Sequence, residues 1–502
     1  MKTTNLNQKY VVNHAYKFRG DHSNIIITNN NSARYNSYAL RNEITTSFAW
    51  CTHPDLAYLF SFFDGTRTLD EIAKHFSAYR NMDRQQLLDT VSSCLSNQEP
   101  VLIPAGEQHW VPIPKNFLIP ATDGTVRDNL LGKIDLPFIR KFFNLTEVRL
   151  HVPNSMVLML NTDCSTDCVY CYADKPKILQ PLPFQRVKEL IKEAYELDMA
   201  YLDLDGGDFF LYKHWREVLV EMLRYDYEPN ISTKYPMTRP IVDELKKLGI
   251  RHIQLSIDSV NSQEMQRILN VDEQYTGRVL EGLRLLDEAG IEITIKPVIT
   301  KYNDSEESVN NTIDTLTSFG NVRRILFTPA EFSQFKPLTY YSTRTQLTRL
   351  KTIVEQRNKE CAAELKFLGY REHKTVEQRE REFPLRPLCT GNVYGFFVLP
   401  DGKVTLCEQL YWHPYFILGD LKKQSIMEVW NSRKAISLWE FSQERVRDSS
   451  PCKTCKAFDA CRRGLGNCWR QAVAAYGPEN FDYPAPNCPK APPASNGFFI
   501  DC

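Results

Sequence analysis

Three closely spaced cysteines constrain this chain more than any other feature. Cys164, Cys168 and Cys171 form a C-x3-C-x2-C run directly after an apolar stretch typical of a strand, residues 156–160. A 4Fe-4S cube normally takes four cysteine ligands, so a loop with three leaves one iron open to an outside ligand. A zinc site is the alternative, because closely spaced cysteines also bind zinc. The twenty residues after Cys171 contain no histidine or cysteine to complete it, which favours the cluster.

At these residues the chain resembles the radical S-adenosylmethionine (SAM) enzymes, whose open iron chelates the methionine part of SAM. The resemblance implies reductive cleavage of SAM to a 5′-deoxyadenosyl radical. It also implies that Tyr170, the hydrophobic residue before the third cysteine, lies beside the cofactor. An electron donor such as flavodoxin or ferredoxin would be a partner.

Length and charge limit what else the chain can be. Its 502 residues are enough for about three domains of ordinary size. The 61 basic and 61 acidic residues cancel, so we expect no nucleic-acid partner, because phosphate binding shows as a basic excess. The first residues form no apolar signal segment and no run of about 18 apolar residues occurs, so we expect a cytoplasmic protein with no membrane partner. In such a reducing compartment, the 14 cysteines indicate metal binding better than disulfides.

The middle of the chain alternates strand-length apolar runs with amphipathic, helix-length segments. This pattern predicts an α/β fold, a partial (β/α)6 TIM-type barrel over residues 151–345. In such barrels function lies at the carboxyl ends of the strands. The six predicted strands are residues 156–161, 200–204, 230–234, 252–257, 292–297 and 324–328.

Gly206, Gly207 and Asp208 follow the second predicted strand. Glycines let the backbone approach a ligand closely, and a carboxylate accepts hydrogen bonds from an ammonium group. The run resembles the family's Gly-Gly-Glu motif, which holds the amino group of SAM, although the aspartate is one methylene shorter. Read without the cysteine loop, the same residues are typical of a tight turn.

Later strands supply further cofactor contacts that the resemblance implies. Ser256 and Asp258 match the family's Ser-Leu-Asp segment beside the SAM ribose or carboxylate, although Asp258 is also a candidate helix cap. Val298 follows the fifth strand, where the family passes the adenine. Arg267 is a candidate partner of the SAM carboxylate, with a solvent-facing helix position as the alternative.

The carboxyl-terminal region, residues 389–502, carries a second group of cysteines. It resembles the SPASM extension, which binds two auxiliary 4Fe-4S clusters, so the resemblance implies three 4Fe-4S clusters in all. The implied ligands are Cys389, Cys407 and Cys468 for the first auxiliary cluster, and Cys452, Cys455, Cys461 and Cys488 for the second.

Two features of this region depart from the SPASM pattern. Six residues separate Cys461 from Cys468, where the family usually has three, so we expect a longer loop there. The first auxiliary set has only three cysteines and would keep an open iron unless Cys361 or Cys502 closes it. A zinc ribbon is the alternative for the whole region.

Glu408 directly follows Cys407. Related sulfatase-maturing enzymes carry an aspartate at the matching position, so Glu408 is the candidate catalytic general base. An exposed glutamate beside a cluster loop is the plain alternative.

Residues 37–115 resemble the PqqD-like element, a winged-helix-like domain that recognises leader peptides by pairing with them along an edge strand. Thr68 and Glu71 have the spacing of a capping box, which predicts a helix start there. A DNA-binding winged helix and a structural cap are the alternatives, and the balanced charge disfavours the first. The remaining predicted segments are an amino-terminal extension at 1–36, a linker at 116–150 and a helical bridge at 346–388.

Together the resemblances imply a radical SAM enzyme that modifies a ribosomally synthesised precursor peptide bearing a leader sequence. The expected product is an intramolecular cross-link, either a thioether or a carbon–carbon or carbon–oxygen bond. One alternative is formylglycine formation of the sulfatase-maturase kind. Another is a zinc-stabilised peptide-binding adaptor without catalysis.

Overall fold

The protein is described by a computed structural model. The described residues are 5–30, 44–45, 48–104, 110–122, 124–132, 134–144, 148–173, 180–228, 230–370 and 374–495. The chain forms two compact units, which are described separately below. The amino-terminal unit comprises residues 1–155, 192–201 and 223–228, and the barrel unit comprises residues 156–191, 202–222 and 229–502.

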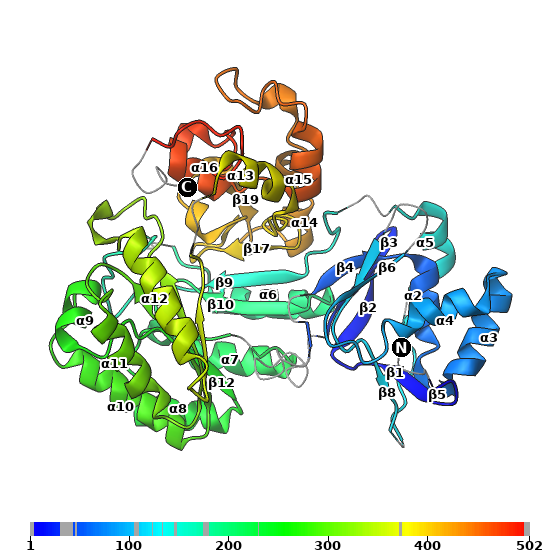
Figure 1. Ribbon diagram of the computed structural model, residues 1–502, viewed down its shortest axis with the longest axis horizontal. Helices are drawn as coiled ribbons and strands as arrows, with labels where there is room; N and C mark the ends of the chain where they lie inside the picture. Colours follow the sequence, from blue (N-terminus) through cyan, green and yellow to red (C-terminus); the bar gives the residue numbers. More distant parts are fainter. Residues whose placement is uncertain are drawn as a thin grey trace. The chain divides into compact units, whose positions relative to one another are not determined.

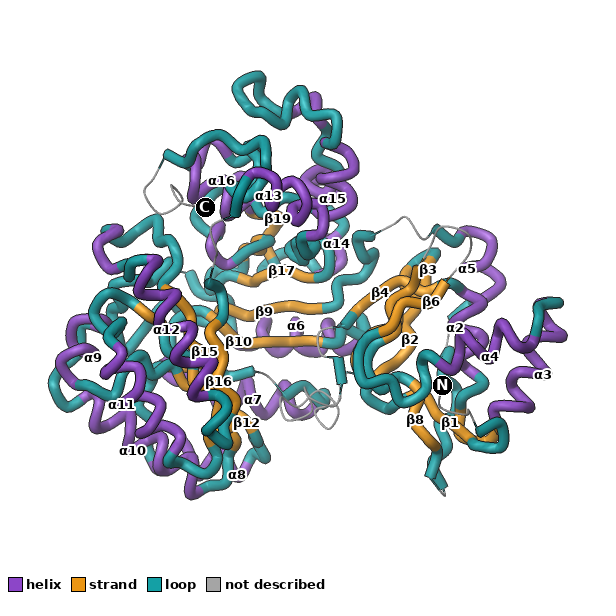
Figure 2. The backbone as a smooth tube through the Cα atoms, viewed as in Figure 1, coloured by secondary structure: helices purple, strands orange, loops and turns teal. Residues whose placement is uncertain are grey.

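In the described residues of the amino-terminal unit, three small antiparallel sheets combine with helices α2 to α5 (Figures 1 and 2). Its sheets have the strand orders β5-β1-β8, β2-β3-β4 and β6-β7. Its elements are β1 (Lys9–Val12), β2 (Tyr16–Asp21), β3 (Asn24–Asn29), β4 (Ala49–Thr52), α2 (Pro54–Ser61), β5 (Asp64–Thr68), α3 (Leu69–Arg80), α4 (Arg84–Ser92), β6 (Val101–Pro104), β7 (Trp110–Ile113), β8 (Leu118–Pro120) and α5 (Leu136–Phe142).

One apolar core joins the whole amino-terminal unit. Tyr16 and Ile25 from the first strands are fully buried in the same cluster as Phe60 and Ile72 from the helices. The segment 1–36, predicted as an extension, therefore contributes three strands to this unit. Their burial shows why: β2 and β3 bury most of their six residues each and need the rest of the unit to cover them.

The order of α2, β5, α3, α4 and the β6–β7 hairpin is that of a winged helix. Thr68 caps α3 with a reciprocal bond from Glu71, which confirms the capping box expected from the sequence. The unit departs from a simple winged helix because β5 pairs with β1.

The barrel unit contains all six predicted barrel strands, at slightly different bounds. They are β9 (Ser155–Met159), β10 (Tyr201–Asp205), β11 (Ser232–Thr233), β12 (His252–Leu255), β13 (Glu292–Ile295) and β15 (Val322–Pro329). The last four pair in parallel in this order, and the short β14 (Val298–Ile299) also pairs with β15. Parallel pairing brings the carboxyl ends of the strands to one edge, where the predicted site residues follow them.

Helices alternate with these strands and cover the outside of the sheet (Figure 2). Gly290 has a φ of 74° directly after the cap of α10, where glycine commonly ends a helix. The helices are α6 (Phe184–Glu196), α7 (Trp215–Arg224), α8 (Arg239–Lys247), α9 (Ser262–Leu269), α10 (Tyr275–Glu288), α11 (Glu306–Thr317) and α12 (Arg344–Arg357).

The segment 346–388, predicted as a helical bridge, contains a strand. After α12, β16 (Glu364–Phe367) pairs in parallel with β15 and extends the barrel sheet by one strand. The sequence does not mark β16 as a strand, because four residues between two charged helical stretches give only a weak period-two signal. The helix α13 (Val376–Glu382) follows it.

The carboxyl-terminal region adds three antiparallel strands to the other edge of the barrel. They continue the sheet in the order β10-β9-β17-β18-β19 (Figure 1). Gly402 has a φ of 85° in the turn between β17 and β18, a conformation that glycine adopts readily. The elements are β17 (Gly395–Val398), β18 (Lys403–Thr405), β19 (Ile417–Asp420), α14 (Ile426–Trp430), α15 (Arg433–Trp439), a π-helical turn (Ala460–Leu465) and α16 (Trp469–Tyr476).

Within the described part of the chain, no helix has the length and apolar character needed to cross a membrane.

Candidate iron–sulfur and SAM site

The three-cysteine loop leaves the carboxyl end of β9 and is held by main-chain hydrogen bonds. The Asp167 and Val169 N–H groups donate to the last carbonyls of α9, at 2.8 and 2.9 Å. Ser333 donates to the Cys171 carbonyl at 2.6 Å. Cys164 is exposed, Cys168 is buried and Cys171 is half-buried. The three thiols therefore differ in exposure, and the loop backbone is hydrogen-bonded both to α9 and to Ser333.

The two glycines after β10 lie where no side chain fits. A Cβ on Gly207 would come within 2.3 Å of the Asp163 carbonyl oxygen, and one on Gly206, whose φ is 111°, within 2.8 Å of that of Asn161. The Gly207 N–H donates to the Asn161 carbonyl at 2.9 Å. The glycines thus allow β10 to approach the chain that leads into the cysteine loop.

Asp208 connects this turn to the cysteine loop. It is 4% exposed, and its carboxylate accepts hydrogen bonds from the Ser165 hydroxyl at 2.7 Å and from the Thr233 hydroxyl. A carboxylate offers about four acceptor positions, so these two bonds leave capacity for a further donor. The contact of Asp208 with the SAM amino group stays a prediction.

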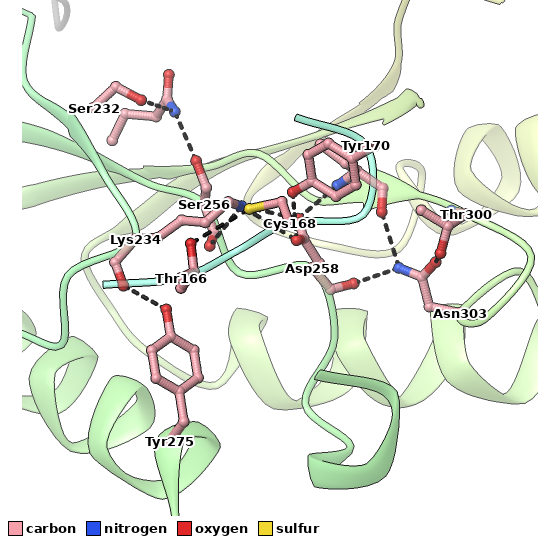
Figure 3. Close-up of polar contacts among 12 residues, drawn as sticks. Thr166, Cys168, Tyr170, Ser232, Lys234, Ser256, Asp258, Tyr275, Thr300 and Asn303 are labelled. Carbon is pink, nitrogen blue, oxygen red and sulfur yellow. Dashed lines mark hydrogen bonds and ion pairs between the residues drawn. The ribbon is translucent and has the colours of Figure 1, made fainter. Parts of the chain in front are cut away.

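Asp258, after β12, is the centre of a buried polar network (Figure 3). Its carboxylate accepts from the Tyr170 hydroxyl at 2.6 Å and from the Val298 N–H at 2.9 Å, and it pairs with Lys234 Nζ at 3.2 Å. The Lys234 ammonium also lies 5.5 Å from the Tyr170 ring centroid. The network joins the ends of three strands to the residue before the last loop cysteine.

Charge sets the protonation of this network. Burial raises the pKa of Tyr170 well above its usual value, and the Asp258 carboxylate raises it further. Burial alone would lower the pKa of Lys234, but attraction to Asp258 and Cys168 raises it above its usual value. Lys234 therefore stays an ammonium and Tyr170 a phenol.

Lys234 and Asn303 are site residues that sequence reasoning missed. The Asn303 side chain donates to the carbonyls of Asp258 and Val298, at 2.8 and 3.0 Å (Figure 3). Lys234 directly follows β11, and its ammonium also reaches the Ser256 carbonyl at 3.4 Å. The position of Lys234 directly after a predicted parallel strand could have marked it as a site residue.

Arg267 lies apart from these contacts on the exposed side of α9. The helix meets the cysteine loop through the carbonyls of Ile268 and Leu269. Arg267 thus occupies a solvent-facing helix position, and its contact with the SAM carboxylate stays a prediction.

A cavity of about 660 Å³ opens in front of the cysteine loop. One wall contains Cys164, Cys171 and the two glycines. The opposite wall comes from the β17–β18 turn and the segment after it, with Leu399, Pro400, Asp401, Lys403, Tyr411, Trp412, Pro414 and Ile417. Its volume falls within the range of small-molecule sites, which is about 300–1,000 Å³.

A group of acids lies beside this cavity. Asp205 ends β10, and surrounding protein raises its pKa to about 6, to which the Glu408 carboxylate also contributes, although part of its surface still reaches solvent. Burial, with Asp205 and Glu408, raises the pKa of the cavity residue Tyr172 well above its usual value. Glu408, the predicted base, is therefore close to Asp205, which the sequence did not single out.

The raised pKa of Asp205 predicts a pH-dependent effect of Asp205→Asn on stability. Because folding raises this pKa from 3.8 to about 6, the folded state favours the protonated acid, and stability is lost as pH rises through that range. We expect the melting temperature of the variant, relative to the wild type, to rise between about pH 3.8 and about pH 6 and then level off. Thermal unfolding of both proteins measures this, and a difference that does not change with pH contradicts it.

The structure groups the first auxiliary set, Cys389, Cys407 and Cys468. Burial raises the pKa of Cys389 and of Cys407, and the nearby Cys468 raises both further. Cys468 lies at the amino end of α16, and Glu408 Oε2 is 3.8 Å from the Cys407 sulfur. Cys361 lies beyond α12, with its N–H on the Arg357 carbonyl, and Cys502 lies outside the described residues.

The second auxiliary set is Cys452, Cys455, Cys461 and Cys488. Burial raises the pKa of Cys488, and all three other members raise it further. Burial raises the pKa of Cys452 too, with Arg462 opposing and Cys461 adding to the rise. The four sulfurs are thus neighbours, although Cys488 is distant from the other three in the sequence.

These sets suit clusters of several irons. No three His, Cys, Asp or Glu side chains lie close enough to bind one metal ion, as far as the described residues go. In a cube each thiolate binds a different iron, so its ligands need not converge on one centre. The buried Arg462 Nη1, beside the second auxiliary set, has no hydrogen-bond partner among the described atoms. An acceptor such as a cluster sulfide would satisfy it.

Two family descriptions match the chain. Residues 159–316 match the Radical SAM superfamily, and residues 389–456 match SPASM, an iron–sulfur cluster-binding domain. The first covers the cysteine loop and the barrel strands up to β14, and the second begins at Cys389.

Curated relatives are similar over about two thirds of the chain. The PqqA peptide cyclase of Granulibacter bethesdensis is 23% identical over 359 residues, 68% of this chain and 88% of the relative. The AdoMet-dependent heme synthase of Methanosarcina barkeri is 20% identical, over 62% of this chain and 92% of the relative.

A solved structure is similar over nearly the whole chain. SuiB of Streptococcus suis, bound to its precursor peptide SuiA, aligns with a TM-score of 0.63 at 14% identity, covering 95% of this chain and 98% of SuiB. At this identity the likeness shows the fold, which includes the amino-terminal unit.

The cysteine loop, the partial barrel that carries it and the auxiliary cysteines agree with these matches. The chain is an enzyme that carries a radical SAM domain at residues 159–316 and a SPASM iron–sulfur domain at residues 389–456.

Proposed function

We propose that this enzyme forms an intramolecular cross-link in a ribosomally synthesised precursor peptide. The cavity before the cysteine loop carries the proposal, because the SPASM hairpin and the segment after it line this cavity together with Cys164 and Cys171. With about 660 Å³ it has room for a small cofactor and a substrate side chain together. The resemblance to PqqA peptide cyclases and to SuiB supports a peptide as the substrate.

The cofactor ligands follow from the thiol groups. Cys164, Cys168 and Cys171 would hold a 4Fe-4S cluster that binds SAM, and the two auxiliary sets would hold one cluster each. When bound and reduced, the first cluster supplies the electron that cleaves SAM. The protein holds the loop rigid through α9 and excludes water from Cys168. Flavodoxin or ferredoxin is the kind of donor that would deliver this electron in the cytoplasm.

The amino-terminal unit is proposed to bind the leader of the precursor. Its two-stranded sheet β6-β7, which lies within residues 37–115, has an outer edge on each strand, and a peptide strand can add to such an edge. The winged-helix order of the following elements supports the PqqD-like assignment. Leader binding of this kind holds the core peptide near the enzyme at high effective concentration.

The test uses the reconstituted enzyme, SAM, a reductant and the peptide encoded by a short reading frame beside the gene. We expect a product that has lost two hydrogen atoms, resists fragmentation between the linked residues and does not react with a hydrazide probe. A hydrazide-reactive product indicates formylglycine instead. A peptide without its leader should be modified far more slowly, and equal rates would remove the leader-binding role.

Glu408 is proposed as the general base that removes the proton from the substrate during cross-linking. Glu408→Gln is expected to lower the yield of cross-linked peptide about 10²-fold, while SAM cleavage and iron content are retained. Glu428→Gln is the matched control, because Glu428 lies in the capping box of α14. An unchanged yield in Glu408→Gln rules out this role.

A further inference from the structure

Cationic side chains surround the second auxiliary set. Each of three cations donates to a different sulfur of the set. These contacts are Arg386 Nη2 to Cys461 Sγ at 3.0 Å, Arg462 Nη2 to Cys452 Sγ at 3.6 Å and Lys490 Nζ to Cys455 Sγ at 3.8 Å. Cationic N–H donors around a thiolate stabilise the negative charge on its sulfur.

Arg462 is the most deeply buried of the three, with 6% of its surface exposed. It lies in the π-helical turn, a rare conformation that is frequent at functional sites. Its guanidinium is 5.0 Å from the Trp469 ring centroid and donates to the Asp482 carbonyl at 3.0 Å. These contacts fix the side chain against the cysteine set.

The remaining donor of Arg462 indicates what the side chain faces. Nη1 is buried and has no hydrogen-bond partner within the described structure. Leaving a buried donor unpaired is unfavourable, and more so when the group is charged. A cluster held by the neighbouring Cys452 would bring inorganic sulfide, an acceptor, to this side of the chain.

Arg386 approaches the same set from the segment before Cys389. Its guanidinium stacks on Phe383 at 3.9 Å, and its N–H groups donate to the carbonyls of Phe383 and Gly466, at 2.9 and 2.6 Å. These described partners are a ring and main-chain carbonyls, which do not cancel its positive charge. Its charge therefore acts on Cys461.

The first auxiliary set has a different electrostatic surrounding. Glu408 lies 3.8 Å from the Cys407 sulfur and brings negative charge to it. The nearby cation Arg470 is paired with Glu331 at 2.7 Å. The two auxiliary cysteine sets thus lie in different electrostatic environments, negative at Cys407 and positive at the second set.

We propose that Arg386 and Arg462 raise the reduction potential of the cluster on the second auxiliary set above that of the first. Reduction adds one electron and makes the cluster more negative, so N–H donors and positive charge stabilise the reduced form. An electron that can move between the two auxiliary clusters would then be found mainly on the cluster of the second set. This inference depends on the proposed binding of clusters by the two sets.

Redox titration followed by electron paramagnetic resonance tests this inference. The full-length chain with Cys164, Cys168 and Cys171 replaced by alanine is reconstituted, which leaves only auxiliary signals. The signal that disappears on replacing Cys452 and Cys488 by alanine belongs to the second set. We expect Arg462→Met and Arg386→Gln each to make its reduction at least tenfold less favourable, a fall of about 59 mV for one electron.

Arg445→Met is the matched control, since Arg445 packs on Phe441 at 4.7 Å while its bonds go to Ser437 and Tyr415. Its midpoint should equal that of the parent. Unchanged midpoints in both test variants, with full iron, overturn this inference alone. If Arg462→Met does not take up iron, the half-buried Arg386 decides the outcome by itself. A parent protein without iron on the second set overturns the inference together with the proposed function.

Discussion

Replacing Cys168 by alanine is expected to abolish the formation of 5′-deoxyadenosine from SAM. Cys168 is the buried member of the loop, and losing one of three thiolates leaves no stable set for a 4Fe-4S cluster. Iron should fall by about four atoms per chain, while the auxiliary clusters remain. Chromatography of the reaction with dithionite, together with iron analysis, measures both effects.

Cys94→Ala provides the matched control for this variant. Cys94 is also a buried cysteine, but it belongs to the core of the amino-terminal unit and lies outside the three cysteine groups. Its removal should leave deoxyadenosine formation unchanged. Formation of deoxyadenosine by Cys168→Ala at the wild-type rate would show that this loop is not the SAM site.

Asp258→Asn is expected to destabilise the barrel unit strongly. The substitution leaves the Lys234 ammonium, whose side chain is 16% exposed, without the carboxylate that it faces. Breaking a buried ion pair by removing one partner costs about 3–5 kcal/mol, because the other charge stays buried. Thermal and denaturant unfolding of the reconstituted protein measure the loss.

Two further variants separate charge from packing. Asp272→Asn removes one partner of the exposed Asp272–Arg278 pair and should leave the melting temperature nearly unchanged. Lys234→Met combined with Asp258→Asn should recover part of the stability, since it removes the unpaired charge. Equal stability of Asp258→Asn and Asp272→Asn would contradict the structural role assigned to this network.

The network has a functional consequence as well. It ties Tyr170, inside the cysteine loop, to the ends of β11 and β12 through Asp258 and Lys234. A loop that holds its thiols in place before the cofactor binds loses less entropy on binding. The stability of this network and the position of the thiols should therefore change together.

Most of the site-bearing fold could be predicted because its signals are local. The cysteine spacing, the period of the six strands and the Gly206–Gly207 turn are each written in a few consecutive residues. The cap at Thr68 has the same origin, and the structure confirms it. Local patterns of this kind need no knowledge of tertiary contacts.

What the sequence did not predict depends on neighbours distant in the chain. The pairing of Lys234 with Asp258 joins two strand ends, and the acid Asp205 acquires its raised pKa from groups on other elements. Arg267 lies on an exposed face of α9, in agreement with the solvent-facing alternative, and its contact with SAM stays a prediction. The strand β16 is short and becomes visible only when it pairs with β15.

The cationic surroundings of the second auxiliary set illustrate the same limit. Arg386 and Arg462 are ordinary basic residues in a chain with no net charge. Only the fold brings both to the sulfurs of one cysteine set. An arginine close to a cysteine in the sequence is therefore weaker evidence for a charged cysteine environment than an arginine close to it in space.

The most direct test of the central claim is reconstitution of the wild-type chain without oxygen, followed by iron, sulfide and zinc analysis and incubation with SAM and dithionite. The account predicts about twelve iron and twelve sulfide per chain, for three cubes, and formation of 5′-deoxyadenosine. Zinc without sulfide, together with intact SAM, would contradict it and leave a zinc-stabilised peptide-binding protein.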